Sequence, residues 1–233
     1  MAGATKAGAE ERVVRIQVGG VELEGNLGLP VESQGMVLFA HGSGSSRHSP
    51  RNRYVARVLR DLNLGTLLMD LLTTEEEIAE AQTRHLRFNI GLLAERLVGA
   101  TNWLAAEPVT AELSVGYFGA STGGGAALVA AAMAPDRVGA VVLRGGRPDL
   151  AGTALSLVRT PTLLLVGGLD TSVLELNREA YDQLSAPEKQ LIVVPGATHL
   201  FEEPGTLEQV ARLASDWFLK YLPRPARALG TEA

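Results

Sequence analysis

The 233-residue sequence contains no cysteine, and this absence excludes several kinds of chemistry. Disulfides, thiolate nucleophiles and cysteine-ligated zinc or iron–sulfur centres all require that residue. The chain also shows no histidine and glutamate spacing of the H-E-x-x-H type. We therefore expect no metal site, and any nucleophile must be a residue other than cysteine.

Long hydrophobic runs and an excess of positive charge are also missing. No apolar run approaches the roughly 18 residues of a membrane span, and the opening MAGATKAGAEER has no apolar core of a signal peptide. Lys and Arg number 21 against 26 Asp and Glu, which gives a net charge of -5 and no field to attract phosphate backbones. We expect a soluble, cytoplasmic protein that binds neither membranes nor nucleic acid.

The residues that are present suffice for one sizeable core. Hydrophobic residues make up 46% of the chain, which favours a single domain. We predict that this domain covers residues 12–222 and that the polar or proline-containing ends, 1–11 and 223–233, are flexible. The sequence leaves the oligomeric state open, a homo-oligomer included.

The pattern along the chain indicates the fold class. Two short extended runs, 13–18 and 21–27, flank Gly19-Gly20 and predict a hairpin. Beyond them, unbroken apolar runs alternate with helical stretches, which is typical of a mostly parallel sheet covered on both faces. The expected strands are 36–40, 66–70, 113–118, 138–143, 162–168 and 190–194, and the expected helices are 52–62, a long region ending near Trp103, 122–133, 173–185 and 205–221. We predict a three-layer α/β/α sandwich.

Polar clusters follow four of these strands, where ligands of open parallel sheets bind. They are HGSGSS (41–46), GASTGGG (119–125), LDTS (169–172) and GATH (196–199). GASTG matches the G-x-S-x-G nucleophile elbow, with Ser121 on a turn from strand to helix. The pattern alone is weak in a chain with 26 glycines, but its place between an apolar run and a small-residue helix favours Ser121 as nucleophile over a plain glycine-rich turn.

A serine nucleophile needs a base, and the base needs a carboxylate to orient it. His199 follows a strand near the end of the sheet, whereas His41, His48 and His85 lie at poorer positions. We predict His199 as the base rather than an ordinary loop histidine. Asp170 is the predicted acid, although capping of the next helix is an alternative role for it. Asp149 also follows a strand and is the second candidate acid.

Two backbone N–H groups are expected to stabilise the oxyanion of the tetrahedral intermediate. Thr122 follows the nucleophile and supplies the first. The loop HGSGSS supplies the second, with Ser43 favoured and Gly44 in reserve. Phosphate binding is an alternative role for this loop, but the loop lacks the G-x-x-x-x-G-K-[ST] spacing and the lysine of a phosphate-binding loop.

The segments HGSG, GASTG, LD and TH, in this order, resemble the α/β-hydrolase superfamily. HGSGSSRHSPRN, RHLRF and GASTGGGAAL resemble the dienelactone-hydrolase-like members most, over about residues 12–222. This resemblance implies cofactor-free hydrolysis of small-molecule esters or lactones through an acyl-enzyme. Dienelactone hydrolases proper use cysteine as nucleophile, and serine at position 121 instead favours a serine hydrolase of the carboxylesterase type.

Other functions are compatible with the same residues. A thioesterase or a perhydrolase would share the triad, and a ligand-binding protein on this fold would need no catalysis. Arg47 and Arg147 are candidate clamps for a carboxylate-bearing substrate, although surface salt bridges explain them equally well. Residues 144–161 are too few for a large cap domain, so we expect an open site that favours short acyl groups, with any cover coming from residues 71–90.

Overall fold

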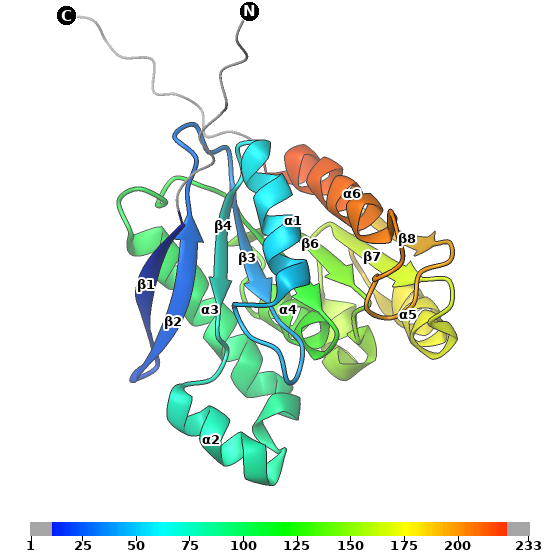
Figure 1. The fold of residues 1–233 in the computed structure, drawn as a ribbon, viewed down its shortest axis with the longest axis horizontal. Helices are drawn as coiled ribbons and strands as arrows, with labels where there is room; N and C mark the ends of the chain where they lie inside the picture. The colour runs from blue at the N-terminus through cyan, green and yellow to red at the C-terminus, as the bar shows by residue number, and fades with distance from the viewer. Residues whose placement is uncertain (1–10, 223–233) are drawn as a thin grey trace, which may run out of the picture.

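The computed structural model describes residues 11–222, which form an eight-stranded sheet (Figure 1). The strands, in their order across the sheet, are β1 (Glu11–Val18), β2 (Val21–Gly28), β4 (Gly65–Met69), β3 (Met36–Ala40), β5 (Val115–Ala120), β6 (Val138–Arg144), β7 (Thr162–Gly167) and β8 (Lys189–Val194). β1 and β2 form the antiparallel hairpin expected around Gly19-Gly20, and β2 pairs antiparallel with β4. The six strands from β4 to β8 are parallel. The predicted mostly parallel α/β sheet is confirmed.

Helices cover both faces of this sheet (Figure 1). The helices are α1 (Pro50–Asp61), α2 (Thr74–Thr83), α3 (Ile90–Ala106), α4 (Thr122–Met133), α5 (Thr171–Gln183) and α6 (Thr206–Tyr221). α1 and α6 pack side by side on one face, while α3 and α4 pack together on the other. α2 stands apart from both layers, at the edge where the parallel strands end (Figure 1).

Two apolar cores result, one on each side of the sheet. Neighbouring residues of β5 contribute side chains to both cores. Tyr117 packs into the core under α3 and α4, and Phe118 packs into the core under α1 and α6. Both side chains are fully buried, and each contributes about 1.5–3 kcal/mol through burial. Tyr117 places its hydroxyl 2.7 Å from Thr101 Oγ1, so its polar atom is satisfied. These cores explain why the inner parallel strands are largely apolar, whereas β8, at the edge of the sheet, begins with Lys189 and Gln190.

The long helical region expected to end near Trp103 is divided in two. α2 ends at Arg84, which adopts a left-handed conformation with φ of 52°. A short 3-10 helix (Leu86–Phe88) follows, and the Asn89 side chain then caps α3. α2 itself starts with a capping box between Thr73 and Glu76. The two helices therefore begin at separate N-caps, Thr73 and Asn89.

The connection between β6 and β7 holds only a short helical segment, Pro148–Leu157, so no cap domain is inserted there. The strand expected at 113–118 instead covers 115–120, and the other predicted strands agree within two residues. The ends expected to be flexible lie outside the described residues, except residue 11, which begins β1. Residues 11–222 contain no helix of the length and apolar character needed to span a membrane.

Candidate active site

Ser121 occupies the sharp turn between β5 and α4. Its backbone has φ of 49° and ψ of -124°, a conformation that costs a residue with a side chain about 1–3 kcal/mol. Flanking glycines permit the turn: a Cβ on Gly119 would lie 2.7 Å from the Cα of Gly124, and a Cβ on Gly123 would lie 2.3 Å from the carbonyl oxygen of Ala40. The G-x-S-x-G pattern thus reflects close backbone packing around a strained serine.

His199 and Asp170 form a hydrogen-bonded pair at the same edge of the sheet. They follow β8 and β7, and His199 Nδ1 lies 2.6 Å from Asp170 Oδ2. The Asp170 side chain makes no capping hydrogen bond to α5, so the alternative capping role is not observed. Because an ionised carboxylate only accepts hydrogen bonds, Nδ1–H is the donor and Nε2 carries the lone pair. The pair presents Nε2 as a base.

Asp149, the second candidate acid, has a different partner. Its two carboxylate oxygens accept hydrogen bonds from Nε and one terminal nitrogen of Arg147, at 2.8 and 2.7 Å. The hydrogen bond from Arg147 to this carboxylate raises the pKa of the guanidinium. The structure therefore pairs His199 with Asp170, and Asp149 with Arg147.

One cavity of about 870 Å³ connects the serine and the histidine. Most of its lining residues carry polar side chains. They come from the loop after β3, the start of α1, the loop after β4, the start of α2, the end of β5 with the turn after it, the end of β6 and the loop after β8. The lining residues are 42–52, Asp70, Leu72, Thr74, Glu77, Ala120, Ser121, Arg144, His199 and Leu200. Ser121 and His199 thus face a common space, and residues near 71–90 cover part of it.

The two residues whose N–H groups are expected to bind the oxyanion contact each other through the Thr122 side chain. The Ser43 N–H donates to Thr122 Oγ1 at 2.8 Å, so its hydrogen is engaged by a side chain. Thr122 is the first residue of α4, and the N–H groups at a helix start have no partner within the helix. Gly42 holds the loop against the nucleophile, because a Cβ there would lie 3.0 Å from Ser121 Cβ. The Thr122 N–H is therefore the better placed donor for an oxyanion. The Ser43 N–H can act as the second donor only if its hydrogen is shared between Thr122 Oγ1 and the oxyanion.

His41, a poor base by its position in the sequence, has a role in holding this loop. It is 7% exposed, its Nδ1 lies 3.0 Å from the Gly42 carbonyl oxygen, and its Nε2 accepts the Leu71 N–H at 3.2 Å. The ring therefore joins the loop after β3 to the loop after β4. This role depends on a contact across 30 residues, which the sequence pattern does not indicate.

Arg47 and Arg147, the candidate substrate clamps, are both engaged in ion pairs. Arg47 lines the cavity, but its guanidinium contacts Asp70 and lies 2.5 Å from a Glu24 oxygen. Arg147 is not among the cavity-lining residues and pairs with Asp149. These contacts favour the salt-bridge interpretation for both. Two other arginines, Arg51 and Arg144, line the cavity instead.

An open, mostly parallel sheet with a strained serine turn and a His–Asp pair at its carboxyl edge defines a hydrolase of the α/β-hydrolase superfamily. The chain belongs to the dienelactone hydrolase family, whose model matches residues 68–221. The resemblance seen in the sequence is confirmed.

Solved structures agree with this assignment. The chain is similar to a dienelactone hydrolase from Anabaena variabilis, with 61% identity, a TM-score of 0.90 and coverage of 92% of this chain and 99% of that one. It also resembles Est1E from Butyrivibrio proteoclasticus, with 16% identity, a TM-score of 0.74 and coverage of 90% and 98%. The second likeness shows the fold alone. Family and neighbours together support a hydrolase.

Curated relatives are longer than this chain. Proteins named putative phosphoribosyl transferase, from two strains of Mycobacterium tuberculosis, are 59% identical over 229 residues. The match covers 96% of this chain and 50% of each relative, so the chain spans half the length of these relatives.

Proposed function

We propose that this chain is a serine hydrolase that cleaves small, polar carboxylic esters or lactones through an acyl intermediate on Ser121. The observation that carries the proposal is the His199–Asp170 hydrogen bond of 2.6 Å, beside a cavity that both His199 and Ser121 line. A serine hydroxyl is a weak nucleophile until a base removes its proton. Ser121 and His199 both line this cavity, and Asp170 holds the ring of His199 through its hydrogen bond to Nδ1.

The reaction proceeds in two halves. His199 Nε2 takes the hydroxyl proton as Ser121 Oγ attacks the ester carbonyl carbon, and a tetrahedral oxyanion forms. The bond to the leaving alcohol breaks, the protonated histidine gives that alcohol its proton, and acyl-Ser121 remains. Water then attacks the acyl carbon with His199 again as base, and the carboxylic acid leaves while Ser121 recovers its proton. Asp170 keeps Nδ1 protonated and stabilises the imidazolium.

The start of α4 stabilises the oxyanion in this proposal. The Thr122 N–H stands at the positive end of a 12-residue helix, where a developing negative charge is favoured. Removal of one such donor costs other enzymes about 10²–10³ in kcat. Ser43 supplies the second N–H once the oxyanion competes with Thr122 Oγ1 for its hydrogen.

The wall of the cavity points to the substrate class. Serine, arginine and carboxylate side chains dominate it, and the only larger aliphatic side chains are Leu72 and Leu200. Such a surface suits polar, short-acyl substrates. Thioesters and peroxide are accepted by the same machinery, and comparison of kcat/KM on matched oxygen and sulfur esters separates these activities.

The test is hydrolysis of p-nitrophenyl acetate by the wild type, Ser121→Ala and a matched control, Ser45→Ala. Ser45 lines the same cavity but has no role in the proposed reaction. We expect at least about a thousandfold loss of kcat for Ser121→Ala in a folded protein and near-normal turnover for Ser45→Ala. Near-normal turnover of Ser121→Ala would contradict the proposal, as would the absence of hydrolysis of any ester by the wild type.

A further inference from the structure

Arg144 is a buried cation with no carboxylate partner among the residues that the structure describes. It is the last residue of β6, opposite Ala120 in the sheet, and it is 6% exposed. Its NH2 group lies 3.4 Å from Asn52 Oδ1, and its guanidinium lies 5.9 Å from the Phe201 ring centroid. Its Nε has no hydrogen-bond partner among residues 11–222. Burial of an uncompensated charge is strongly unfavourable, so this guanidinium favours an anion in the adjoining cavity.

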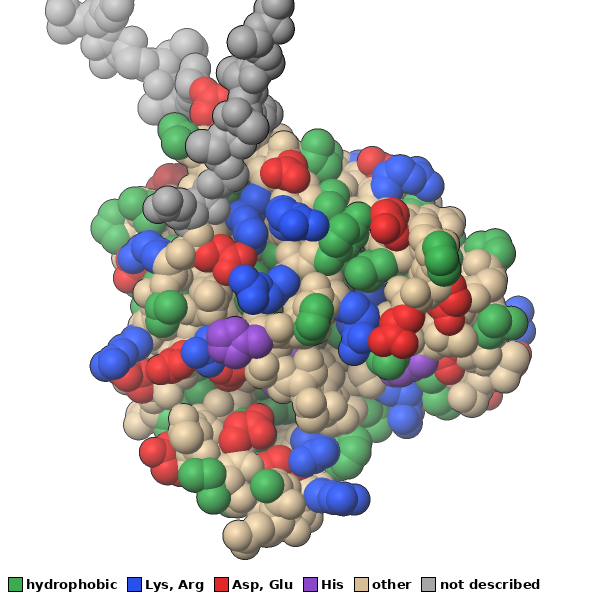
Figure 2. Space-filling model, viewed as in Figure 1, with side chains coloured by type: hydrophobic (Ala, Val, Ile, Leu, Met, Phe, Trp, Pro, Cys, Tyr) green, Lys and Arg blue, Asp and Glu red, His purple; other side chains and the backbone are tan. Residues whose placement is uncertain are grey.

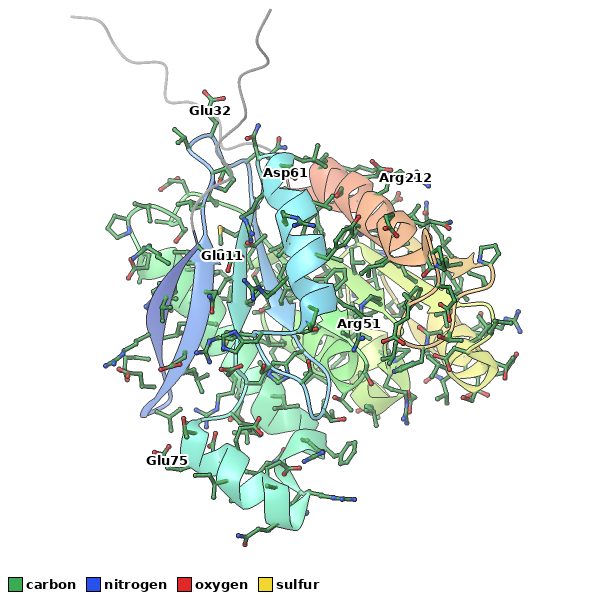
Figure 3. All side chains as sticks on the ribbon, in the orientation of Figure 1. Glu11, Glu32, Arg51, Asp61, Glu75 and Arg212 are labelled. Carbon is green, nitrogen blue, oxygen red and sulfur yellow. The ribbon has the colours of Figure 1, made fainter. Side chains whose placement is uncertain are left out.

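Arg51 adds a second cation to the same wall. Both arginines line the cavity that contains Ser121, and Arg51 lies at the end of α1 nearest the loops of the site (Figure 3). One terminal nitrogen lies 2.9 Å from Glu202, whose side chain is 63% exposed, so solvent weakens this pairing. The Arg51 Nε is buried and has no hydrogen-bond partner among the described residues.

The two charges influence each other directly. Burial, and next the positive charge of Arg51, lower the pKa of Arg144 to about 10. Arg144 therefore remains protonated at neutral pH and repels its neighbour. An anion in the cavity beside the two guanidiniums would relieve this repulsion. The charge of Arg47, in contrast, is compensated, because its guanidinium pairs with Asp70 and Glu24.

The first turn of α1 adds a third set of donors. α1 has 12 residues and begins at Pro50, and residues 49–52 line the cavity. The Ser49 side chain caps the Asn52 N–H, which leaves the Arg51 N–H at the positive end of the helix. Two guanidiniums and a helix start suit a phosphate group, with its three terminal oxygens and up to two negative charges. A carboxylate offers two oxygens and one charge.

We propose that Arg144, Arg51 and the first turn of α1 bind a phosphate group of the substrate, beside the acyl group that Ser121 attacks. This inference rests on the proposed function, and it specifies the substrates as esters that carry a phosphomonoester. Figure 2 shows several Lys and Arg side chains on the face of the molecule that carries α1. Arg53 and Arg57 of α1 are exposed and do not line this cavity. They provide matched controls for the effect of charge alone.

The first test is calorimetric titration of inorganic phosphate into Ser121→Ala protein, which measures binding without any need for hydrolysis. We expect saturable binding that weakens at least about tenfold when Arg51→Gln or Arg144→Gln is added, since each removes charged hydrogen bonds. Arg53→Gln removes the same charge from α1 outside the cavity and should leave binding unchanged. If Arg144→Gln fails to fold, Arg51→Gln alone decides the outcome. Absence of saturable binding, or equal binding by Arg51→Gln, would overturn the proposal.

The second test compares three acetate esters of a propyl chain that ends in a phosphate, a carboxylate or a hydroxyl group. We expect kcat/KM to be at least about tenfold higher for the phosphate ester than for the hydroxyl ester, and Arg51→Gln to remove this preference. A higher value for the carboxylate ester would overturn the choice of phosphate. Phosphate binding without hydrolysis of any of the three esters would support the subsite and contradict the proposed esterase.

Discussion

The hydroxyl of Thr122 accepts a hydrogen bond of 2.8 Å from the N–H of Ser43 and so links the loop after β3 to the start of α4, beside Ser121. In the free protein this bond satisfies the Ser43 N–H, which in the proposed reaction would also serve the oxyanion. The hydroxyl and the oxyanion are therefore competing acceptors for one hydrogen.

This competition predicts the behaviour of Thr122→Val, which keeps the side-chain shape and removes the hydroxyl. We expect kcat/KM for p-nitrophenyl acetate to be at least that of the wild type, because the Ser43 N–H then serves the oxyanion alone. Thr122→Ser, which retains the acceptor, is the control and should match the wild type. A loss of more than about tenfold in Thr122→Val alone would show that the hydroxyl is needed to hold the loop.

The separate partners of the two aspartates predict a contrast between their amides. Asp170→Asn should lower kcat by up to about 10⁴, because an amide no longer fixes the tautomer of His199. Asp149→Asn breaks only the pairing with Arg147, away from the cavity, and should change kcat little. Steady-state kinetics of the two variants measure the contrast, and a larger loss in Asp149→Asn would reverse the assignment of the acid.

The polar cavity and the absence of a cap between β6 and β7 predict a preference for short acyl chains. Each methylene gains about 0.8 kcal/mol only when it is buried, and Leu72 and Leu200 are the only larger aliphatic side chains that line this cavity. p-Nitrophenyl acetate or butyrate should give a higher kcat/KM than the laurate or palmitate ester, below the micellar limit. A steady rise toward the longest chains would reveal an apolar tunnel instead.

Glu80 ties α2 to the segment that follows it. Its side chain is buried, pairs with Arg87 and accepts the Leu86 N–H at 2.6 Å. Burial raises the pKa of Glu80, but the hydrogen bonds and charge of Arg87 and the nearby N–H groups outweigh it and hold that pKa below its ordinary value of 4.5. A carboxylate with a lowered pKa stabilises the fold above its ordinary pKa, and this contribution disappears as pH falls through the lowered value.

Glu80→Gln should therefore lower the midpoint of urea unfolding at neutral pH, and the difference from the wild type should shrink in acid. Unfolding curves at both pH values provide the measurement. Glu77→Gln, on the same helix, is the control for the loss of charge alone. An equal difference at both pH values would mean that the charge of Glu80 contributes nothing.

The fold was largely predictable from the sequence because the buried strands are largely apolar and glycines mark the turns. The elbow was predictable for the same reason: Gly119 and Gly123 leave room for backbone that approaches from other segments. The division between α2 and α3 was missed because the left-handed conformation of Arg84 has no strong signature in the residue itself.

Side-chain partners were harder to predict than positions. Arg144 ends β6 and Arg147 follows it three residues later, yet the first lines the cavity and the second pairs with Asp149. Gly145 lies between them with φ of 52° and turns the chain. The direction in which each arginine points depends on this turn and on distant partners such as Asn52, so residue type and spacing did not distinguish them.

The most direct test of the central claim is labelling with a fluorophosphonate, followed by peptide mapping of the adduct. The reagent phosphonylates a serine that an adjacent base activates. We predict one adduct per chain, on Ser121, its absence in Ser121→Ala, and much slower labelling in His199→Ala. An adduct on Ser43 or Ser45, or a wild-type protein that hydrolyses esters and is never labelled at Ser121, would contradict the assignment of Ser121 as the nucleophile.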